Sequence, residues 1–238
     1  MRILTYTVTP EEDGRMVKGI LRGSLQLSYT LLKSLKWREN AILLNGQSVH
    51  VNTIVHAGDT VSVVLSERTP REDLYCANAA KPDIVYEDDD LLVLNKPAGV
   101  AMHPKSGDAS APSLAAMLTS YLGEGSVPHF VSRLDKGTSG LLIAAKNGYV
   151  HDRLRRALHS SDLRREYRAV AVGRVEPPCG VIDAPIGRAE GSIIRRCVCA
   201  DGLPSLTEYE TLQVNDRFTL LRLRPQTCLL YTSPSPGD

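Results

Sequence analysis

The run from Ser132 to Leu142, which reads Ser-Arg-Leu-Asp-Lys-Gly-Thr-Ser-Gly-Leu-Leu, constrains the fold of this chain more than any other segment. It places one carboxylate, Asp135, between Arg133 and Lys136, and it leads directly into an apolar strand over 140–145. Flanking cations keep a carboxylate ionised, and an ionised carboxylate can act as a nucleophile. The glycines and hydroxyls that follow are typical of a tight turn. The run therefore predicts a fixed loop that holds Asp135, partly buried, at the end of a strand.

By its chemistry alone, a charged turn before a strand is more often a solvated loop than a catalytic one. The order of the residues is more specific, because Arg133 to Leu142 resembles the Arg-Leu-Asp-x-x-Thr-Ser-Gly-Leu-Leu signature of the RluA-type RNA pseudouridine synthases. Ser132 stands where that family commonly has histidine. The resemblance implies that Asp135 is the nucleophile that isomerises uridine in RNA, and that Arg133 fills the stack vacated by the flipped base.

Two further motifs continue this resemblance, which covers about residues 83–227. Asn95-Lys96-Pro97 follows an apolar strand, and the resemblance implies that Lys96 is an active-site wall residue in contact with RNA. Tyr167 opens an alternating strand over 165–173 and takes the place of the family's active-site tyrosine, which stacks on the target base and is a candidate proton acceptor. Arg165, just before it, is a candidate RNA contact of the same site.

The first 66 residues predict a small domain of their own. Leu25–Trp37 predicts a helix, and Asn45-Gly46 between apolar runs predicts a hairpin. A Gly-Asp turn then leads into a strand over 60–64. This order resembles the RNA-binding domain that a ribosomal small-subunit protein shares with many RNA-modifying enzymes, and the alternative is a structural lid. The resemblance implies that three cations of the helix face RNA: Lys33, Lys36 and Arg38.

Together these patterns predict an α+β protein in three parts. A small α/β-hairpin RNA-binding domain over 1–66 is followed by a polar linker over 67–82 and a catalytic domain over 83–227. By resemblance, the catalytic domain is a pseudouridine synthase fold around a central mixed, mostly antiparallel sheet. Residues 228–238 depart from the family's last motif, which continues to a basic residue that pairs with the catalytic aspartate. We interpret this tail as truncated or out-of-frame sequence that lacks the counter-ion.

The distribution of charge favours a polyanionic partner. The formal net charge is +1, but residues 133–174 carry 10 positive and 4 negative side chains, whereas residues 67–132 carry 5 and 10. The basic segment adjoins Asp135, and phosphate contacts supply much of the affinity for nucleic acids. A helix with a solvated arginine face would give the same counts. Together with the motifs, the charges predict RNA as the partner, ribosomal RNA first and transfer RNA as the alternative.

Other features argue against several classes of protein. No apolar run approaches the roughly 20 residues that span a bilayer, and the N-terminus lacks the apolar core of a signal peptide. We therefore expect a cytoplasmic protein without membrane contact. Cys197 and Cys199 have no second Cys or His pair nearby in the sequence, so we expect no metal site. Uridine isomerisation changes no oxidation state, so we expect no cofactor, and we expect the chain to act as a monomer.

Two other function classes stay open. A non-catalytic RNA-binding protein would bind structured RNA yet leave uridine unchanged, and the departing tail favours it. A small-molecule hydrolase would also use Asp135 as its nucleophile. Against the hydrolase, no metal cluster accompanies this residue in the sequence, and Lys136-Gly137-Thr138 lacks the upstream glycine spacing of a phosphate-binding loop.

Overall fold

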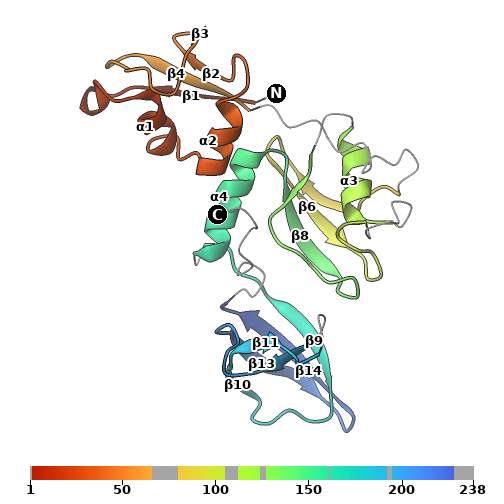
Figure 1. Cartoon of the computed structure of the whole chain (residues 1–238). Coiled ribbons are helices and arrows are strands. Elements are labelled where there is room, and N and C mark those ends of the chain that lie inside the picture. Colours follow the sequence, from red (N-terminus) through yellow and green to blue (C-terminus); the bar gives the residue numbers. More distant parts are fainter. Residues whose placement is uncertain are drawn as a thin grey trace. The chain divides into compact units, whose positions relative to one another are not determined.

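The structure, a computed structural model, describes residues 2–65, 80–104, 112–123, 127–160, 162–191 and 195–227. They belong to two compact units, Met1–Ser160 and Ser161–Asp238 (Figure 1). Helices and antiparallel ladders occur together, so the predicted α+β class is confirmed. Most of the predicted linker and the whole of the 228–238 tail lie outside the described residues. The domain limits drawn from the sequence stay predictions.

The N-terminal part of the first unit is a four-stranded sheet with two short helices. Its strand order is β1-β4-β2-β3, and all three ladders are antiparallel. The predicted turn at Asn45-Gly46 is confirmed, because both residues have positive φ angles of 50° and 83°, as such a hairpin requires. The elements are β1 (Arg2–Thr7), a 3₁₀ turn (Pro10–Glu12), α1 (Val17–Arg22), α2 (Tyr29–Leu35), β2 (Ile42–Leu44), β3 (Gln47–Ser48) and β4 (Thr60–Leu65).

Helix α2 is shorter than the sequence pattern predicts. The Ser28 side chain accepts a hydrogen bond from the Leu31 amide at 3.2 Å and caps the first turn. Gln26 has a φ of 55°, which no helical residue adopts, so the chain before Ser28 is not helical. The buried side of the helix contributes Leu32 and Leu35 to the core of this part.

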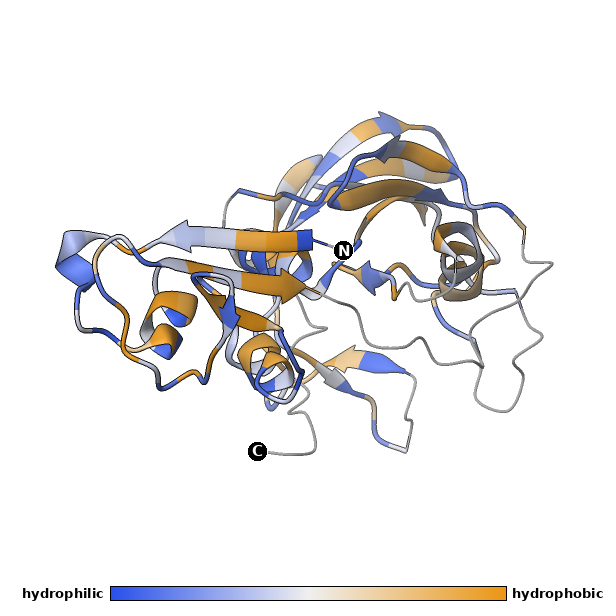
Figure 2. Ribbon diagram, turned by 90° about the horizontal axis from the view of Figure 1, so that it is seen from above, coloured by the Kyte–Doolittle hydropathy of each residue, from blue (hydrophilic) through white to orange (hydrophobic). Residues whose placement is uncertain are grey.

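Figure 2 shows hydrophobic residues concentrated in the helices and strands, with hydrophilic ones in many of the turns.

The rest of the first unit is a second four-stranded sheet, of order β5-β6-β8-β7, also antiparallel throughout. Strand β8 begins and ends where the sequence predicts, and helix α4 packs against β7 and β8. The side chain of Asn147 accepts from the Val150 amide at 2.9 Å and caps α4. The elements are β5 (Ile84–Glu87), β6 (Leu91–Lys96), α3 (Leu114–Leu122), β7 (His129–Phe130), β8 (Gly140–Ala145) and α4 (Gly148–His159).

The second unit is made of strands. Its main sheet has the order β10-β13-β14-β9, and a separate two-stranded ladder joins β11 to β12, all of it antiparallel. The mostly antiparallel pairing expected from the sequence is therefore observed, in sheets that belong to different units. The elements are β9 (Tyr167–Val172), β10 (Cys179–Asp183), β11 (Ile186–Arg188), β12 (Arg196–Val198), β13 (Leu206–Val214) and β14 (Phe218–Pro225).

Candidate active site

The loop that carries Asp135 joins β7 to β8. Leu134 is only 8% exposed and anchors the loop in the core, whereas its neighbours Arg133 and Asp135 are both exposed. The Thr138 amide donates to the Asp135 carbonyl oxygen at 3.0 Å, which closes a tight turn directly after the carboxylate. The sequence predicted a partly buried Asp135. The structure differs, because the loop packs its leucine inward and presents both charged neighbours at the surface.

A buried lysine lies beneath this loop. Lys96 ends β6 opposite Gly140, the first residue of β8, and its side chain is 0% exposed. Its ammonium donates to three carbonyl oxygens, those of Pro97 at 3.0 Å, Val100 at 2.9 Å and Lys136 at 3.3 Å. Three donated hydrogen bonds require the charged form, since only the ammonium has three N–H groups. The described structure therefore gives Lys96 a buried position rather than the RNA-facing surface expected from the sequence.

Lys96 acts on the loop through both geometry and charge. The carbonyl oxygen of Lys136 accepts from the Lys96 ammonium and also from the Gly99 amide at 2.8 Å, so two donors fix the backbone next to Asp135. Burial lowers the pKa of Lys96, and the negative charge of Asp135 opposes that shift. The negative charge of Asp135 therefore offsets part of the cost of burying the Lys96 ammonium.

Arg133 lies near a histidine that the sequence motif did not single out for a role. The His103 ring meets Phe130 edge to face, with centroids 5.7 Å apart. Burial and the charge of Arg133 both lower the pKa of His103, which favours the neutral ring. The charge of Arg133 therefore acts on the His103 ring, which itself packs against Phe130.

The two other predicted residues of the catalytic centre belong to the second unit. Tyr167 opens β9, pairs with Leu223 of β14 and is half-buried. Arg165 precedes it and is also half-buried. The structure therefore brings Arg133, Asp135 and Lys96 together in the first unit, and it places Tyr167 and Arg165 together in the second.

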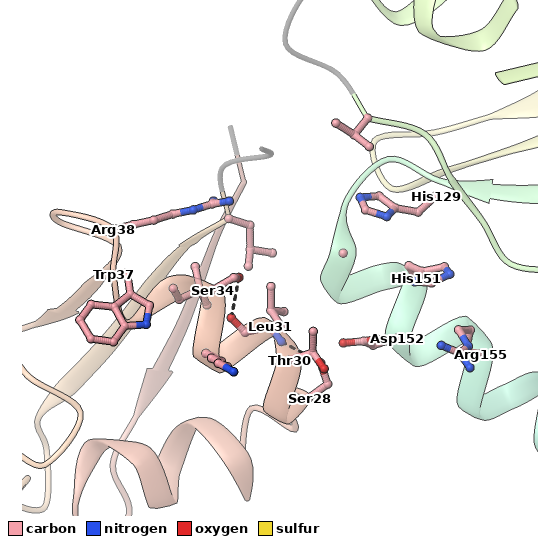
Figure 3. A pocket seen from close by; sticks show the side chains of 15 residues that line it. Ser28, Thr30, Leu31, Ser34, Trp37, Arg38, His129, His151, Asp152 and Arg155 are labelled. Atoms are coloured by element: carbon pink, nitrogen blue, oxygen red, sulfur yellow. Dashed lines mark hydrogen bonds between the residues drawn. The ribbon is translucent and has the colours of Figure 1, made fainter. Parts of the chain in front are cut away.

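A groove of about 680 Å³ separates helix α2 from helix α4 within the first unit (Figure 3). We call it the α2–α4 groove. Direct contacts outside the groove join its two walls to each other. Tyr149 of α4 packs against the hydrophobic core of the N-terminal part, and Arg156 Nη2 donates to the Gln26 carbonyl oxygen at 2.6 Å. Its lining includes five side chains that carry or can accept a positive charge: Lys33, Arg38, His129, His151 and Arg155.

Two kinds of feature are absent from the described residues. Among them, no group of three or more His, Cys, Asp or Glu side chains is placed to hold a metal ion. No helix in the described part of the chain is both long and apolar enough to cross a membrane.

Comparison with known proteins identifies the family. The model of the RNA pseudouridylate synthase family matches residues 90–228. The chain belongs to this family. The match contains Arg133, Asp135, Lys96 and Tyr167, and it spans parts of both units.

Relatives of this synthase extend the match to the N-terminal part. The chain is 34% identical over 207 residues to the uncharacterized RNA pseudouridine synthase YjbO of Bacillus subtilis, covering 86% of this chain and 73% of the relative. It is 34% identical over 230 residues to ribosomal large subunit pseudouridine synthase D of Vibrio parahaemolyticus, covering 94% of this chain and 69% of the relative.

A solved structure supports the fold of this synthase. Human RNA pseudouridylate synthase domain containing 1 superposes with a TM-score of 0.51 at 24% identity. The superposition covers 68% of this chain and 63% of the human chain, so the chain spans less than two thirds of that protein.

The sequence predicted that three cations of the N-terminal domain face RNA: Lys33, Lys36 and Arg38. Two of them, Lys33 and Arg38, line the α2–α4 groove. Lys36 is not among the described residues that line it. Of these three cations, only Lys33 belongs to α2 in the structure, because the helix ends at Leu35 and both Lys36 and Arg38 follow it.

Sequence reasoning missed three further residues of the groove. Trp37 lies between the predicted RNA contacts Lys36 and Arg38. It is the single tryptophan of the chain, and this could have marked it as a candidate binding residue. His151 lies one helical turn before Arg155 on α4, a spacing that puts both on one face. His129 comes from β7, and no sequence pattern connects it to α2.

Proposed function

We propose that this chain converts uridine to pseudouridine in ribosomal RNA, with Asp135 as the nucleophile. The observation that carries the proposal is an exposed carboxylate on a loop fixed by the buried Lys96 ammonium, at the position of the family's Arg-Leu-Asp motif. The choice of ribosomal RNA rests on the relative from Vibrio parahaemolyticus, whose name specifies the large ribosomal subunit.

The reaction needs no oxidant or metal. The bond between ribose C1′ and uracil N1 breaks, the freed base turns, and C1′ joins C5, while the proton of C5 leaves and N1 gains one. Asp135 can assist by attacking the ribose carbon, by adding to the base or by abstracting a proton, and the proposal holds for each route. Withdrawing the base from its stack costs a few kcal/mol, which phosphate contacts and an inserted side chain offset.

Other side chains occupy positions of the family's motifs, and we assign their roles from those positions. Arg133, exposed beside Asp135, fills the stack that the flipped uridine leaves. Tyr167 stacks on the flipped base and is the candidate proton acceptor. Lys96 positions the loop through its hydrogen bond to the Lys136 carbonyl. The remaining expected RNA contacts are Lys33, Lys36, Arg38 and Arg165.

The test replaces the nucleophile with its neutral isostere. Asp135→Asn keeps the size of the side chain and removes its charge, so pseudouridine formation in ribosomal RNA falls to background while RNA binding persists. Asp89→Asn, at an exposed carboxylate in the turn between β5 and β6, is the matched control and keeps full activity. Product is measured by chemical mapping of pseudouridine after incubation with RNA.

The outcomes separate the proposal from its alternative. Appreciable pseudouridine from the Asp135→Asn chain would refute the nucleophile. RNA binding by the unaltered chain with no pseudouridine in any RNA would favour the non-catalytic RNA-binding function that the sequence left open.

A further inference from the structure

We propose that the α2–α4 groove binds an unpaired segment of RNA, with one base stacked on Trp37 and the backbone held by the cations of both walls. This inference rests on the proposed function only in taking the bound strand to be part of the substrate, distinct from the uridine that reaches Asp135.

Trp37 has the position that base stacking requires. Its side chain is 85% exposed although indole is among the largest apolar groups, and it lies near Arg38 at the edge of the groove, with its ring directed away from α4 (Figure 3). An exposed indole gains by stacking on a nucleobase, whatever the base, because every base presents a π face. Because Arg38 follows Trp37 in the chain, a nucleotide stacked on the indole can also have its phosphate bound by the guanidinium.

The opposite wall supplies charge from a different part of the chain. His151 and Arg155 come from α4 and His129 from β7, and Asp152 is the one acid among the described lining residues. The two imidazole rings lie 5.4 Å apart at a tilt of 32°. Burial lowers the pKa of His151, as do His129 and Arg155, while Asp152 opposes the shift. The neutral His151 ring is therefore favoured, and Arg155 is a permanent positive charge of this wall.

The groove fits a single strand better than a duplex. Its volume of about 680 Å³ lies within the range of about 300–1,000 Å³ that is usual for ligand sites. In an A-form duplex the base faces are stacked on one another and are not available to an indole, whereas unpaired bases are. An exposed aromatic residue at the edge of a groove lined by cations is therefore matched to an unpaired segment.

The single tryptophan gives a direct experiment. Titrating the Asp135→Asn chain with an oligouridylate of about 8 nucleotides should quench the fluorescence of Trp37, and the same strand annealed to its complement should not. The absence of quenching, or equal quenching by strand and duplex, would overturn the proposal. Catalysis plays no part in this measurement.

Two pairs of variants test the contacts. Trp37→Ala should weaken binding of a fluorescently labelled oligouridylate about 5- to 100-fold, whereas Tyr29→Ala, at another exposed aromatic residue of the same domain but outside the groove lining, should not. Arg155→Gln should reduce the slope of log K against log salt by about 0.7, whereas Lys18→Gln, an exposed cation of α1, should leave it unchanged. Equal effects within either pair would refute the proposed contacts.

The proposed function and this inference fail separately. Quenching and altered salt slopes without any pseudouridine formation would reject the proposed activity and keep the strand-binding groove. Pseudouridine formation by the unaltered chain without quenching would keep the activity and reject the groove. Circular dichroism of each variant confirms that the fold is retained before its binding is compared.

Discussion

The Lys96→Met variant tests how strongly the buried ammonium holds the loop of Asp135. Methionine has a similar length and no donor, so the substitution removes three hydrogen bonds. The Lys136 carbonyl keeps the Gly99 amide as a donor, and the loss therefore falls on the carbonyls of Pro97 and Val100. At about 1–3 kcal/mol for each acceptor left without a donor, the cost is about 2–6 kcal/mol. The buried charge is removed as well, which offsets part of it, and we expect about 2–4 kcal/mol.

The assay is urea unfolding followed by circular dichroism of the helices α1 to α4, which lie in the same compact unit as Lys96. The control is Lys136→Met, because Lys136 has an exposed side chain and contributes only its backbone carbonyl to the network. Exposed substitutions of this kind usually change stability by no more than about 0.5 kcal/mol. A Lys96→Met chain as stable as Lys136→Met would refute the reasoning, since three charged hydrogen bonds would then contribute nothing net.

Two further predictions concern other parts of the chain. Thr219 is 0% exposed, and its hydroxyl donates to the Gly173 carbonyl at 2.7 Å and accepts from the Val175 amide at 3.1 Å. Thr219→Val removes both hydrogen bonds and should lower the free energy of unfolding by about 1–3 kcal/mol. The measurement is urea unfolding followed by circular dichroism, and an unchanged midpoint would contradict the prediction. The Lys146 ammonium, 2.7 Å from the Glu87 carboxylate, lowers the pKa of Glu87, so its contribution is present above the ordinary pKa and is lost as the pH falls through the lowered one. The stability difference between the unaltered chain and Glu87→Gln should therefore be constant at neutral pH and vanish in acid, and a difference that persists in strong acid would disprove the assignment.

Local signals in the sequence predicted the elements whose ends are fixed by local chemistry. The strand over 140–145 is correct to the residue, because an apolar run follows a glycine with a φ of 126°, a conformation that other residues rarely adopt. The hairpin at Asn45-Gly46 is correct for the same kind of reason. The helix predicted over 25–37 is too long, because apolar periodicity continues through Gln26 and Ser28 although the backbone there does not.

Features that depend on distant partners were beyond the sequence. Lys96 reads as an exposed turn residue, yet one of its three acceptors lies 40 positions away, at Lys136. The α2–α4 groove joins residues of α2 to residues more than 90 positions later, such as His129 and Arg155. Only the packing of α4 against the N-terminal part brings them to one site. The motif could therefore name the candidate nucleophile but not the group that supports it.

The support for Asp135 differs between the cations that the sequence shows and the one that the structure adds. Arg133 and Lys136 are exposed, and their effect on the carboxylate is screened by salt over a Debye length of about 8 Å at physiological ionic strength. Lys96 is buried, so its charge acts through the protein rather than through solvent and is screened much less. Raising the salt concentration should therefore weaken RNA binding strongly, because phosphate contacts are screened, while the hydrogen bond of the buried Lys96 ammonium to the loop is retained. We therefore expect Arg133 and Lys136 to contribute to the attraction of RNA, and Lys96 to hold the backbone of the loop that carries the candidate nucleophile.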